Sequence, residues 1–222
     1  MTNLHLVRAH YEAALEAGGD DGQIVGWRNK QAQLRRFMVI SDLLRGLPFR
    51  SVSDFGCGGG EFLTYLRTAG WSGDFVGVDL SPNVIDVARS KFATDSRANF
   101  EVGTRPSPAD VTVASGVFNV SLDESQNTWL RYCRDIVREM WRASSLAVVF
   151  NMLSLDSDVD RRKIGLAYMD PTDWLAFCRA ELSPHLRLDQ TYGQYDFTIA
   201  AFKMPLDASP MVGAGMQESV DS

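Results

Sequence analysis

Residues 52–62 read Val-Ser-Asp-Phe-Gly-Cys-Gly-Gly-Gly-Glu-Phe, and residues 75–81 read Phe-Val-Gly-Val-Asp-Leu-Ser. The first stretch predicts a short strand, a glycine-rich turn and a helix, and the second predicts a strand that ends on an acid about twenty residues later. Glycines in the turn allow positive φ angles and a close approach of ligand to backbone, while the helix behind them offers unpaired N–H groups. The pattern indicates a nucleotide-binding β-α-β unit.

The glycine spacing separates two classes of cofactor. A dinucleotide-binding fingerprint reads G-x-G-x-x-G, and its third glycine allows helix and strand to pack closely. Counted from Gly56, the place of that third glycine is taken by Glu61. The spacing therefore disfavours a nicotinamide cofactor, and an NAD(P)-dependent oxidoreductase stays open only as an alternative.

Two runs, correctly ordered and spaced, resemble the first two motifs of the class I S-adenosylmethionine-dependent methyltransferases. They are Asp54-x-Gly56-x-Gly58-x-Gly60 and Gly77-Val78-Asp79-Leu80-Ser81. The resemblance implies that the loop wraps the methionine part of S-adenosyl-L-methionine and that Asp79 binds the ribose hydroxyls. It spans about residues 7–203, and implies an α/β fold with a Rossmann-like, seven-stranded, mostly parallel sheet, a terminal antiparallel hairpin and an N-terminal helical lid.

Periodicity and turn residues place the elements along the chain. We predict strands at 52–55, 75–79, 99–102, 109–115, 146–152, 186–191 and 195–203, and helices at 3–17, 29–44, 60–69, 82–93, 127–143 and from Asp170 onward. The link between 102 and 109 is short and proline-interrupted, so we expect a loop or a single turn there. The polar segment 153–167 is expected to be mobile over the carboxyl edge of the sheet.

Length and composition favour a single domain over residues 1–203. The 222 residues are 45% hydrophobic, enough for one core, with a helical lid at 1–47, a cofactor-binding core at 48–203 and a disordered tail at 204–222. The formal net charge is −6 and there is no basic run, which argues against a nucleic-acid substrate. We expect a small-molecule acceptor, and a monomer or homodimer.

The cysteines and the apolar runs bear on compartment and metal binding. Cys57, Cys133 and Cys178 are scattered and show no metal-ligand spacing with the three histidines, so we expect reduced, structural thiols and no metal. No run approaches the length of a membrane span or a signal peptide. The sequence predicts a cytoplasmic protein with no membrane partner.

The candidate cofactor-binding residues follow from the motifs and the ends of the predicted strands. They are Arg36, Asp54, Gly56, Cys57, Gly58, Gly60, Asp79, Leu80, Thr104, Ser115 and Gly116. Arg36 is the candidate for the cofactor carboxylate, because a guanidinium can donate two parallel hydrogen bonds to it; a solvated helix-face arginine is the alternative. Thr104 stands where many class I enzymes carry an acid for the adenine, so we expect a weaker contact.

Methyl transfer needs few conventional catalytic groups, since alignment of nucleophile and methyl accounts for much of the rate. An unactivated hydroxyl must lose its proton, and His10 is the candidate general base because histidine titrates in the right range. A surface histidine is the alternative. Asn119 could orient a substrate oxygen or cap a loop. Tyr168 and Asp170 also flank the expected pocket, although Asp170 before Pro171 is more simply a helix cap.

Further residues resemble one bacterial group of small class I methyltransferases, often of surface-glycan or natural-product pathways. These residues are Trp27, Gln33, Arg36, Phe37, the run Ala114-Ser115-Gly116-Val117-Phe118-Asn119, Tyr168, Asp170, Pro171, Tyr195, Phe197 and Thr198. We therefore expect transfer to oxygen on a small-molecule or glycan-precursor acceptor. An N-methyltransferase acting on a small amine stays open, as does a non-catalytic protein that only binds the cofactor.

Overall fold

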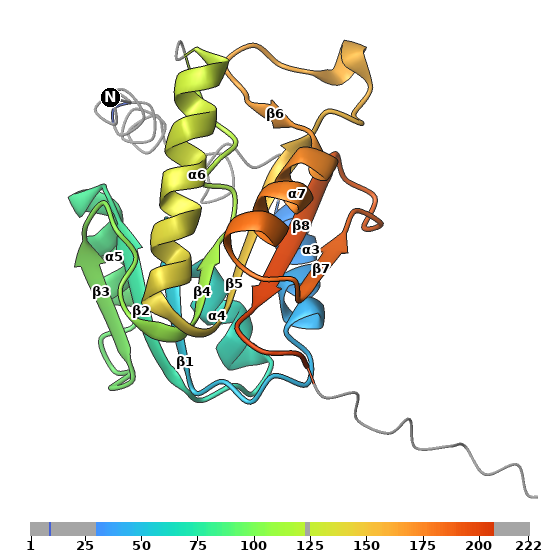
Figure 1. Ribbon diagram of the computed structural model, residues 1–222. Coiled ribbons are helices and arrows are strands. Elements are labelled where there is room, and N and C mark those ends of the chain that lie inside the picture. The colour runs from blue at the N-terminus through green and yellow to red at the C-terminus, as the bar shows by residue number, and fades with distance from the viewer. Residues whose placement is uncertain (1–8, 10–29, 123–124, 207–222) are drawn as a thin grey trace, which may run out of the picture.

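The computed structural model of the chain describes residue 9, residues 30–122 and residues 125–206 (Figure 1). The predicted first helix apart from residue 9, His10, Trp27 and the tail from residue 207 lie outside the described residues.

Within the described residues, an eight-stranded sheet forms the centre of the fold. Its strands are β1 (Ser51–Phe55), β2 (Asp74–Asp79), β3 (Ala98–Val102), β4 (Ala109–Ala114), β5 (Ser144–Ser154), β6 (Tyr168–Met169), β7 (Leu186–Asp189) and β8 (Asp196–Phe202). Their order is β3-β2-β1-β4-β5-β8-β7, with β6 beside β5 and off this path. The first five strands are parallel, while β8 is antiparallel to β5 and β7. The predicted Rossmann-like sheet with a terminal antiparallel hairpin is confirmed.

Two details of the sheet differ from the sequence prediction. The structure has one strand more than predicted, the short β6. It pairs with Leu153 and Ser154 at the end of β5, because β5 runs past its predicted end at residue 152. Two residues are too few for alternation to reveal a strand. The link between β7 and β8 also spans 190–195 rather than 192–194.

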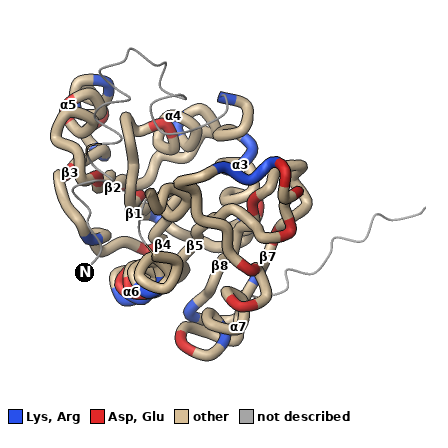
Figure 2. Tube along the Cα trace, turned by 90° about the horizontal axis from the view of Figure 1, so that it is seen from above, with Lys and Arg blue, Asp and Glu red and all other residues tan. Residues whose placement is uncertain are grey.

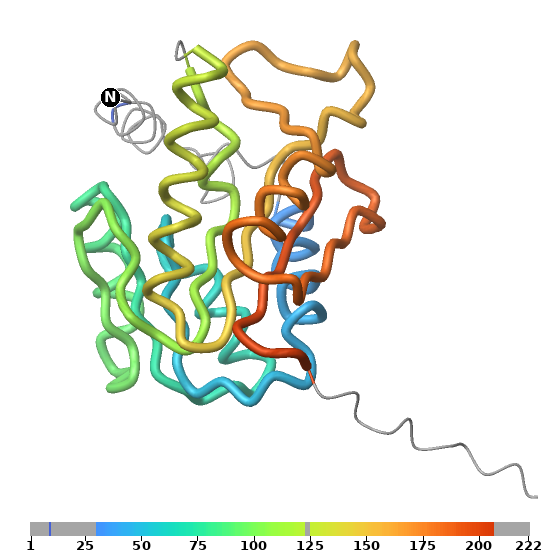
Figure 3. Tube along the Cα trace, in the orientation of Figure 1, coloured from blue at the N-terminus to red at the C-terminus, as the bar shows by residue number. Residues whose placement is uncertain are grey.

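Helices cover both faces of the sheet, as Figures 1 and 3 show. They are α3 (Lys30–Leu43), α4 (Glu61–Thr68), α5 (Pro82–Lys91), α6 (Gln126–Ala143) and α7 (Pro171–Glu181). Phe37, Phe62 and Ile85 bring α3, α4 and α5 into one core. Trp129 of α6 and Trp174 of α7 belong to a second core on the other face. The molecule therefore has three layers, with the sheet between two apolar cores.

The helix α3 is the described part of the predicted N-terminal lid. It packs against β8 and β7, and its residues Phe37 and Ile40 are buried in the core. This helix is thus a layer of the fold, and the polar side chains near its first turns lie beside the pocket described below.

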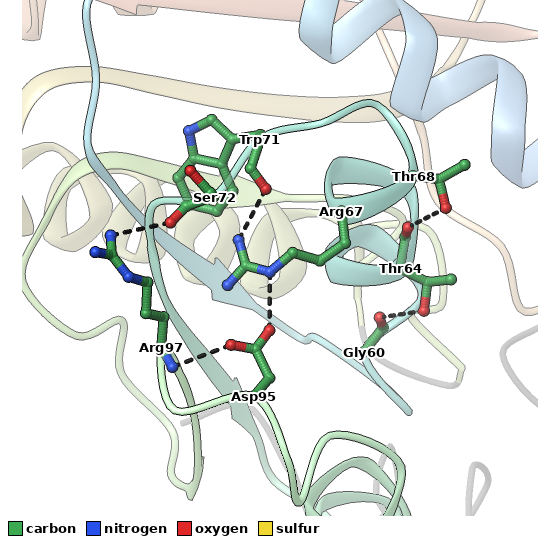
Figure 4. A network of polar contacts seen from close by, with 8 residues as sticks. All are labelled: Gly60, Thr64, Arg67, Thr68, Trp71, Ser72, Asp95 and Arg97. Atoms are coloured by element: carbon green, nitrogen blue, oxygen red, sulfur yellow. Dashed lines mark hydrogen bonds and ion pairs between the residues drawn. The ribbon is translucent and has the colours of Figure 1, made fainter.

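Polar contacts secure the turns that precede β2 and β3 (Figure 4). Arg67 of α4 donates from Nε to Asp95 at 2.8 Å and from Nη1 to the carbonyl of Trp71 at 3.0 Å. Asp95 also accepts the N–H of Arg97 at 3.0 Å, and the Arg97 guanidinium donates to the carbonyl of Ser72 at 3.0 Å. Side chains therefore fix the turns at the amino ends of these strands.

The opposite, carboxyl edge collects the loops that follow the parallel strands. The link 103–108 contains no helix, as predicted, and segment 155–167 lies above this edge at the top of Figure 3. That segment contains only a short 3-10 helix, Val159–Arg161. Ligands of open parallel α/β sheets bind at the carboxyl ends of the strands, so a ligand-binding site is expected at this edge.

Candidate active site

The glycine-rich turn between β1 and α4 is bonded to the neighbouring strand. The N–H groups of Gly56 and Cys57 donate to the carbonyl of Val78 at 2.7 and 3.2 Å. Gly56 has φ 75°, and a Cβ there would lie 2.4 Å from Cγ2 of Val117. Gly60 has φ 81° as the N-cap of α4. The turn needs glycine at both positions for backbone conformation, and at Gly56 also for contact with the loop after β4.

Asp79 ends β2 directly beside this turn. Its Oδ2 accepts the N–H of Gly58 at 3.1 Å, and its Oδ1 accepts the N–H of Ser81 at 3.0 Å. The N–H of Leu80 also acts on this carboxylate. The two oxygens together offer about four lone-pair sites, so capacity for a further donor remains. The acid is thus held by the backbone and can still accept a hydrogen bond from a diol.

Three acids gather on this side of the site, and we call Asp54, Glu61 and Asp79 the acidic cluster. Burial, and to a smaller extent the charges of Glu61 and Asp79, raise the pKa of Asp54 from 3.8 to about 8. Burial also raises the pKa of Asp79, and it raises that of the Cys57 thiol well above its ordinary value. Without a ligand Asp54 is therefore mostly protonated at neutral pH. A nearby cation would lower the raised pKa values of these acids, so the site suits a cationic ligand, and Cys57 is not a reactive thiolate.

The loop after β4 forms the facing wall. The N–H of Gly116 donates to Oδ1 of Asn151 at 2.8 Å. Three buried atoms near this bond have no hydrogen-bond partner within the described part of the chain: Oγ of Ser115, Oδ1 of Asn119 and Nδ2 of Asn151. An unpaired buried polar atom is costly, so these atoms mark the place where a polar ligand would restore the lost hydrogen bonds.

A pocket of about 560 Å³ adjoins this wall. It lies between α3, the loop after β4, the end of β5, segment 161–168 and the link between β7 and β8, and both Gly116 and Asn119 line it. Drug-sized ligands occupy pockets of about 300–1,000 Å³. The cavity is therefore large enough for a small molecule placed next to the cofactor loops.

Arg36 reaches this pocket from α3 and forms an ion pair. Its Nε donates to Oδ2 of Asp196 at 2.5 Å, and both residues are buried. Oδ1 of Asp196 has no hydrogen-bond partner among the described residues and belongs to a residue that lines the cavity. Arg36, the candidate for the cofactor carboxylate, thus lines the same pocket as Gly116, and its Nε is occupied by a carboxylate of the protein.

The other predicted residues are distributed unevenly. Thr104 is exposed in the loop after β3, and Leu80 is half-buried after β2. Asp170 is the N-cap of α7 and accepts from the N–H of Thr172 at 2.7 Å, which confirms the helix cap predicted for it. The hydroxyl of Tyr168 accepts the N–H of Lys163 at 2.9 Å at the rim of the pocket.

Sequence reasoning missed Asn151 and Asp196. Asn151 interrupts the apolar run 146–153 of β5, whereas Asp196 is the first residue of β8, and both are almost completely buried. A single polar residue inside an apolar run was the available signal for Asn151, since such a residue needs a partner or a ligand. No such signal marks Asp196, because it directly follows the polar link 190–195.

Comparison with known proteins agrees with this geometry. Residues 52–143 match a family described as a methyltransferase domain. A predicted methyltransferase of Mycobacterium tuberculosis, Rv1506c, is 34% identical over 157 residues, which cover 70% of this chain and 94% of that protein. The chain belongs to the S-adenosylmethionine-dependent methyltransferases. This assignment replaces the oxidoreductase alternative.

Solved structures show the same fold in other methyltransferases. Magnesium protoporphyrin IX methyltransferase from Synechocystis PCC 6803, with bound SAH, has a TM-score of 0.65 and 12% identity, covering 91% of this chain and 100% of that one. An O-methyltransferase family protein from Burkholderia thailandensis has a TM-score of 0.59 and 16% identity, covering 84% and 61%. At these identities the likeness concerns the class I fold of this methyltransferase.

The described residues fit the family's cofactor, S-adenosylmethionine. The cofactor carries a positive sulfonium, which would lower the raised pKa values in the acidic cluster, and a ribose diol, which suits the remaining acceptor capacity of Asp79. Among the described residues, no group of His, Cys, Asp and Glu has the arrangement of a metal site. Within the same residues, no helix combines the length and hydropathy that crossing a bilayer requires.

Proposed function

We propose that this methyltransferase transfers a methyl group to an oxygen atom of a small acceptor, such as a small-molecule or glycan precursor, bound in the pocket beside α3. The observation that carries the proposal is Oδ1 of Asn119, a buried acceptor atom with no hydrogen-bond partner among the described residues. Asn119 belongs to the loop after β4 and lines the cavity. A hydroxyl of the acceptor would donate to this atom and would be oriented by it.

The cofactor-binding roles belong to the same proposal. Gly56, Cys57, Gly58 and Gly60 would hold the methionine part through the turn, and Asp79 the ribose. The adenosine would be bordered by Leu80 and Thr104. The methionine end would be bordered by Ser115, Gly116, Asp54 and Arg36. The hydrogen bonds of Asp79, the raised pKa of Asp54 and the unpaired Oγ of Ser115 support these positions.

The chemistry is an in-line displacement. The cofactor supplies an activated methyl group on sulfur, and an acceptor oxygen forms a bond to that carbon as the carbon–sulfur bond breaks. A hydroxyl nucleophile also releases its proton, for which we propose His10 as the base on sequence grounds. A small amine as acceptor is the alternative, because it needs only to be neutral. We further propose a cytoplasmic enzyme that works as a monomer or homodimer.

The test is an activity screen of the purified full chain with S-adenosylmethionine and matched sets of alcohols, carboxylic acids and amines. Formation of S-adenosylhomocysteine is measured by mass spectrometry, and the methylated atom is located by NMR. Oxygen methylation supports the proposal, whereas nitrogen methylation favours the amine alternative. Absence of S-adenosylhomocysteine binding would remove the cofactor roles altogether.

Variants then separate orientation from folding. Asn119→Ala should lower kcat by about tenfold or more while S-adenosylhomocysteine affinity stays unchanged, since an oriented hydrogen bond to the nucleophile is lost. Asn127→Ala, an exposed change on α6, is the matched control. His10→Ala should likewise depress turnover more than cofactor affinity, and wild-type turnover would exclude His10 as the base.

A further inference from the structure

The pocket beside α3 is positively charged in a chain whose formal net charge is −6. Its lining includes four basic side chains, Arg35, Arg36, Arg161 and Lys163, and one carboxylate, Asp196. Figure 2, which looks down on the molecule from above, shows the basic positions along α3. The pocket thus has the opposite charge to the acidic cluster on the cofactor side.

Three of these cations are not matched by a strong ion pair. The side chains of Arg35 and Lys163 make no hydrogen bond or ion pair with the described residues, and both are exposed to the pocket. Arg161 lies 3.8 Å from Asp160, its sequence neighbour, and both side chains are more than half exposed. Such an exposed ion pair contributes little free energy. We call Arg35, Arg161 and Lys163 the basic trio.

The segments that carry the basic trio are bonded to one another. Gln194, in the link between β7 and β8, donates from Nε2 to the carbonyl of Ala32 on α3 at 2.9 Å. The hydroxyl of Tyr195, in the same link, donates to Asp158 at 2.5 Å and so ties segment 155–167 to it. The trio therefore projects from segments that are fixed around one cavity.

Like charges around one cavity repel each other, and that repulsion is relieved when an anion enters. Arginine and lysine are also the side chains that recognise carboxylate and phosphate groups. We propose that the methyl acceptor is a small anion, whose carboxylate or phosphate group is bound by the basic trio. This proposal rests on the proposed function, because it names the chemical class of that acceptor.

The test is calorimetric titration of the full chain with inorganic phosphate, benzoate and benzamide at low ionic strength, with and without saturating S-adenosylhomocysteine. Benzamide is the neutral counterpart of benzoate. We expect at least one anion to bind about tenfold more tightly than benzamide. Tighter binding of phosphate indicates a phosphorylated acceptor, and tighter binding of benzoate indicates a carboxylic acid.

Variants identify the residues responsible. The triple change Arg35→Gln, Arg161→Gln and Lys163→Gln should weaken binding of the anion about tenfold or more. The affinity for S-adenosylhomocysteine should stay within about twofold of that of the unaltered chain. Arg131→Gln, an exposed change on α6, should alter neither affinity. All three side chains of the basic trio are exposed, so the triple variant should have the melting temperature of the unaltered chain. If it is less stable, the three single variants are titrated in its place.

Three outcomes would overturn the inference. Benzamide could bind as well as the anions, or the triple variant could bind them like the unaltered chain. Alternatively, the anions could displace S-adenosylhomocysteine and the triple variant could lose that ligand, which would assign the trio to the cofactor carboxylate. Each of these leaves methyl transfer intact, whereas a chain that binds anions but no S-adenosylhomocysteine contradicts the proposed function instead.

Discussion

The N–H of Gly116 donates to Oδ1 of Asn151 at 2.8 Å, so a buried side chain of β5 fixes the loop that follows β4. The strand register explains the contact, because Ala114 pairs with Phe150 and the next residue along β5 is Asn151. This one amide thus determines where the wall of the site lies relative to the cofactor turn.

Asn151→Ala should weaken S-adenosylhomocysteine binding about tenfold and reduce turnover, because the Gly116 N–H loses its acceptor and the loop loses its fixed position. Calorimetry and initial rates measure the two effects. Asn99→Ala, an exposed change on β3, should alter neither. Unchanged affinity in Asn151→Ala would show that the loop holds its position without this bond.

Asp79→Ala should weaken S-adenosylhomocysteine binding by more than about tenfold, on the scale of about 1.5–3 kcal/mol for hydrogen bonds to a charged group. Asp74→Ala is the matched control, because Asp74 is exposed at the other end of the same strand. Calorimetry of both variants decides the matter. Equal affinities for the two would refute the ribose role.

The stability of the chain without cofactor should decrease as the pH rises from about 4 to about 8. In the folded chain Asp54 has a pKa of about 8, whereas its ordinary value is 3.8. Between these values the folded state keeps a proton that the unfolded state has lost, so the free energy of unfolding falls with pH. Urea unfolding at a series of pH values measures this slope.

Asp54→Asn removes the titrating group and should flatten that slope. Asp86→Asn, an exposed change on α5, is the control and should keep the slope of the unaltered chain. An identical pH dependence in Asp54→Asn would mean that other groups are responsible for the change in stability.

The Arg36–Asp196 pair should show strong coupling in a double-mutant cycle. Removing one member of a buried ion pair leaves the other charge without that partner, at a cost of about 3–5 kcal/mol. Arg36→Met and Asp196→Leu should each destabilise by this amount, and the double variant by much less than their sum. The exposed Asp42, paired with Arg45, provides the control in Asp42→Ala, which should cost less than about 1 kcal/mol. Additive effects at Arg36 and Asp196 would contradict the coupling.

The turn and the acid that we propose to bind the cofactor were predictable as local structure, because their signals are local in sequence. The glycine turn, the strand ending on Asp79 and the Ser81-Pro82 start of α5 are each read from a few adjacent residues. Positive φ angles at Gly56 and Gly60 then follow from steric requirements of the turn itself.

The acceptor side was not predictable in the same way. The partner of Arg36 is 160 residues away, and Asn151 binds Gly116, which is 35 residues before it. No spacing rule connects such positions, because their contact depends on the strand order and on the register of β5 with β4 and β8. The basic trio comes from two separate segments for the same reason.

This separation along the chain has a consequence for biosynthesis. The turn at 56–60 and Asp79 leave the ribosome early and close together, whereas the pocket needs α3 and the link between β7 and β8, joined by the Gln194–Ala32 hydrogen bond. Contacts between segments that lie far apart in the sequence form late, because loop closure opposes them. A nascent chain therefore carries the turn and Asp79 outside the ribosome well before the last segment of the pocket has been synthesised.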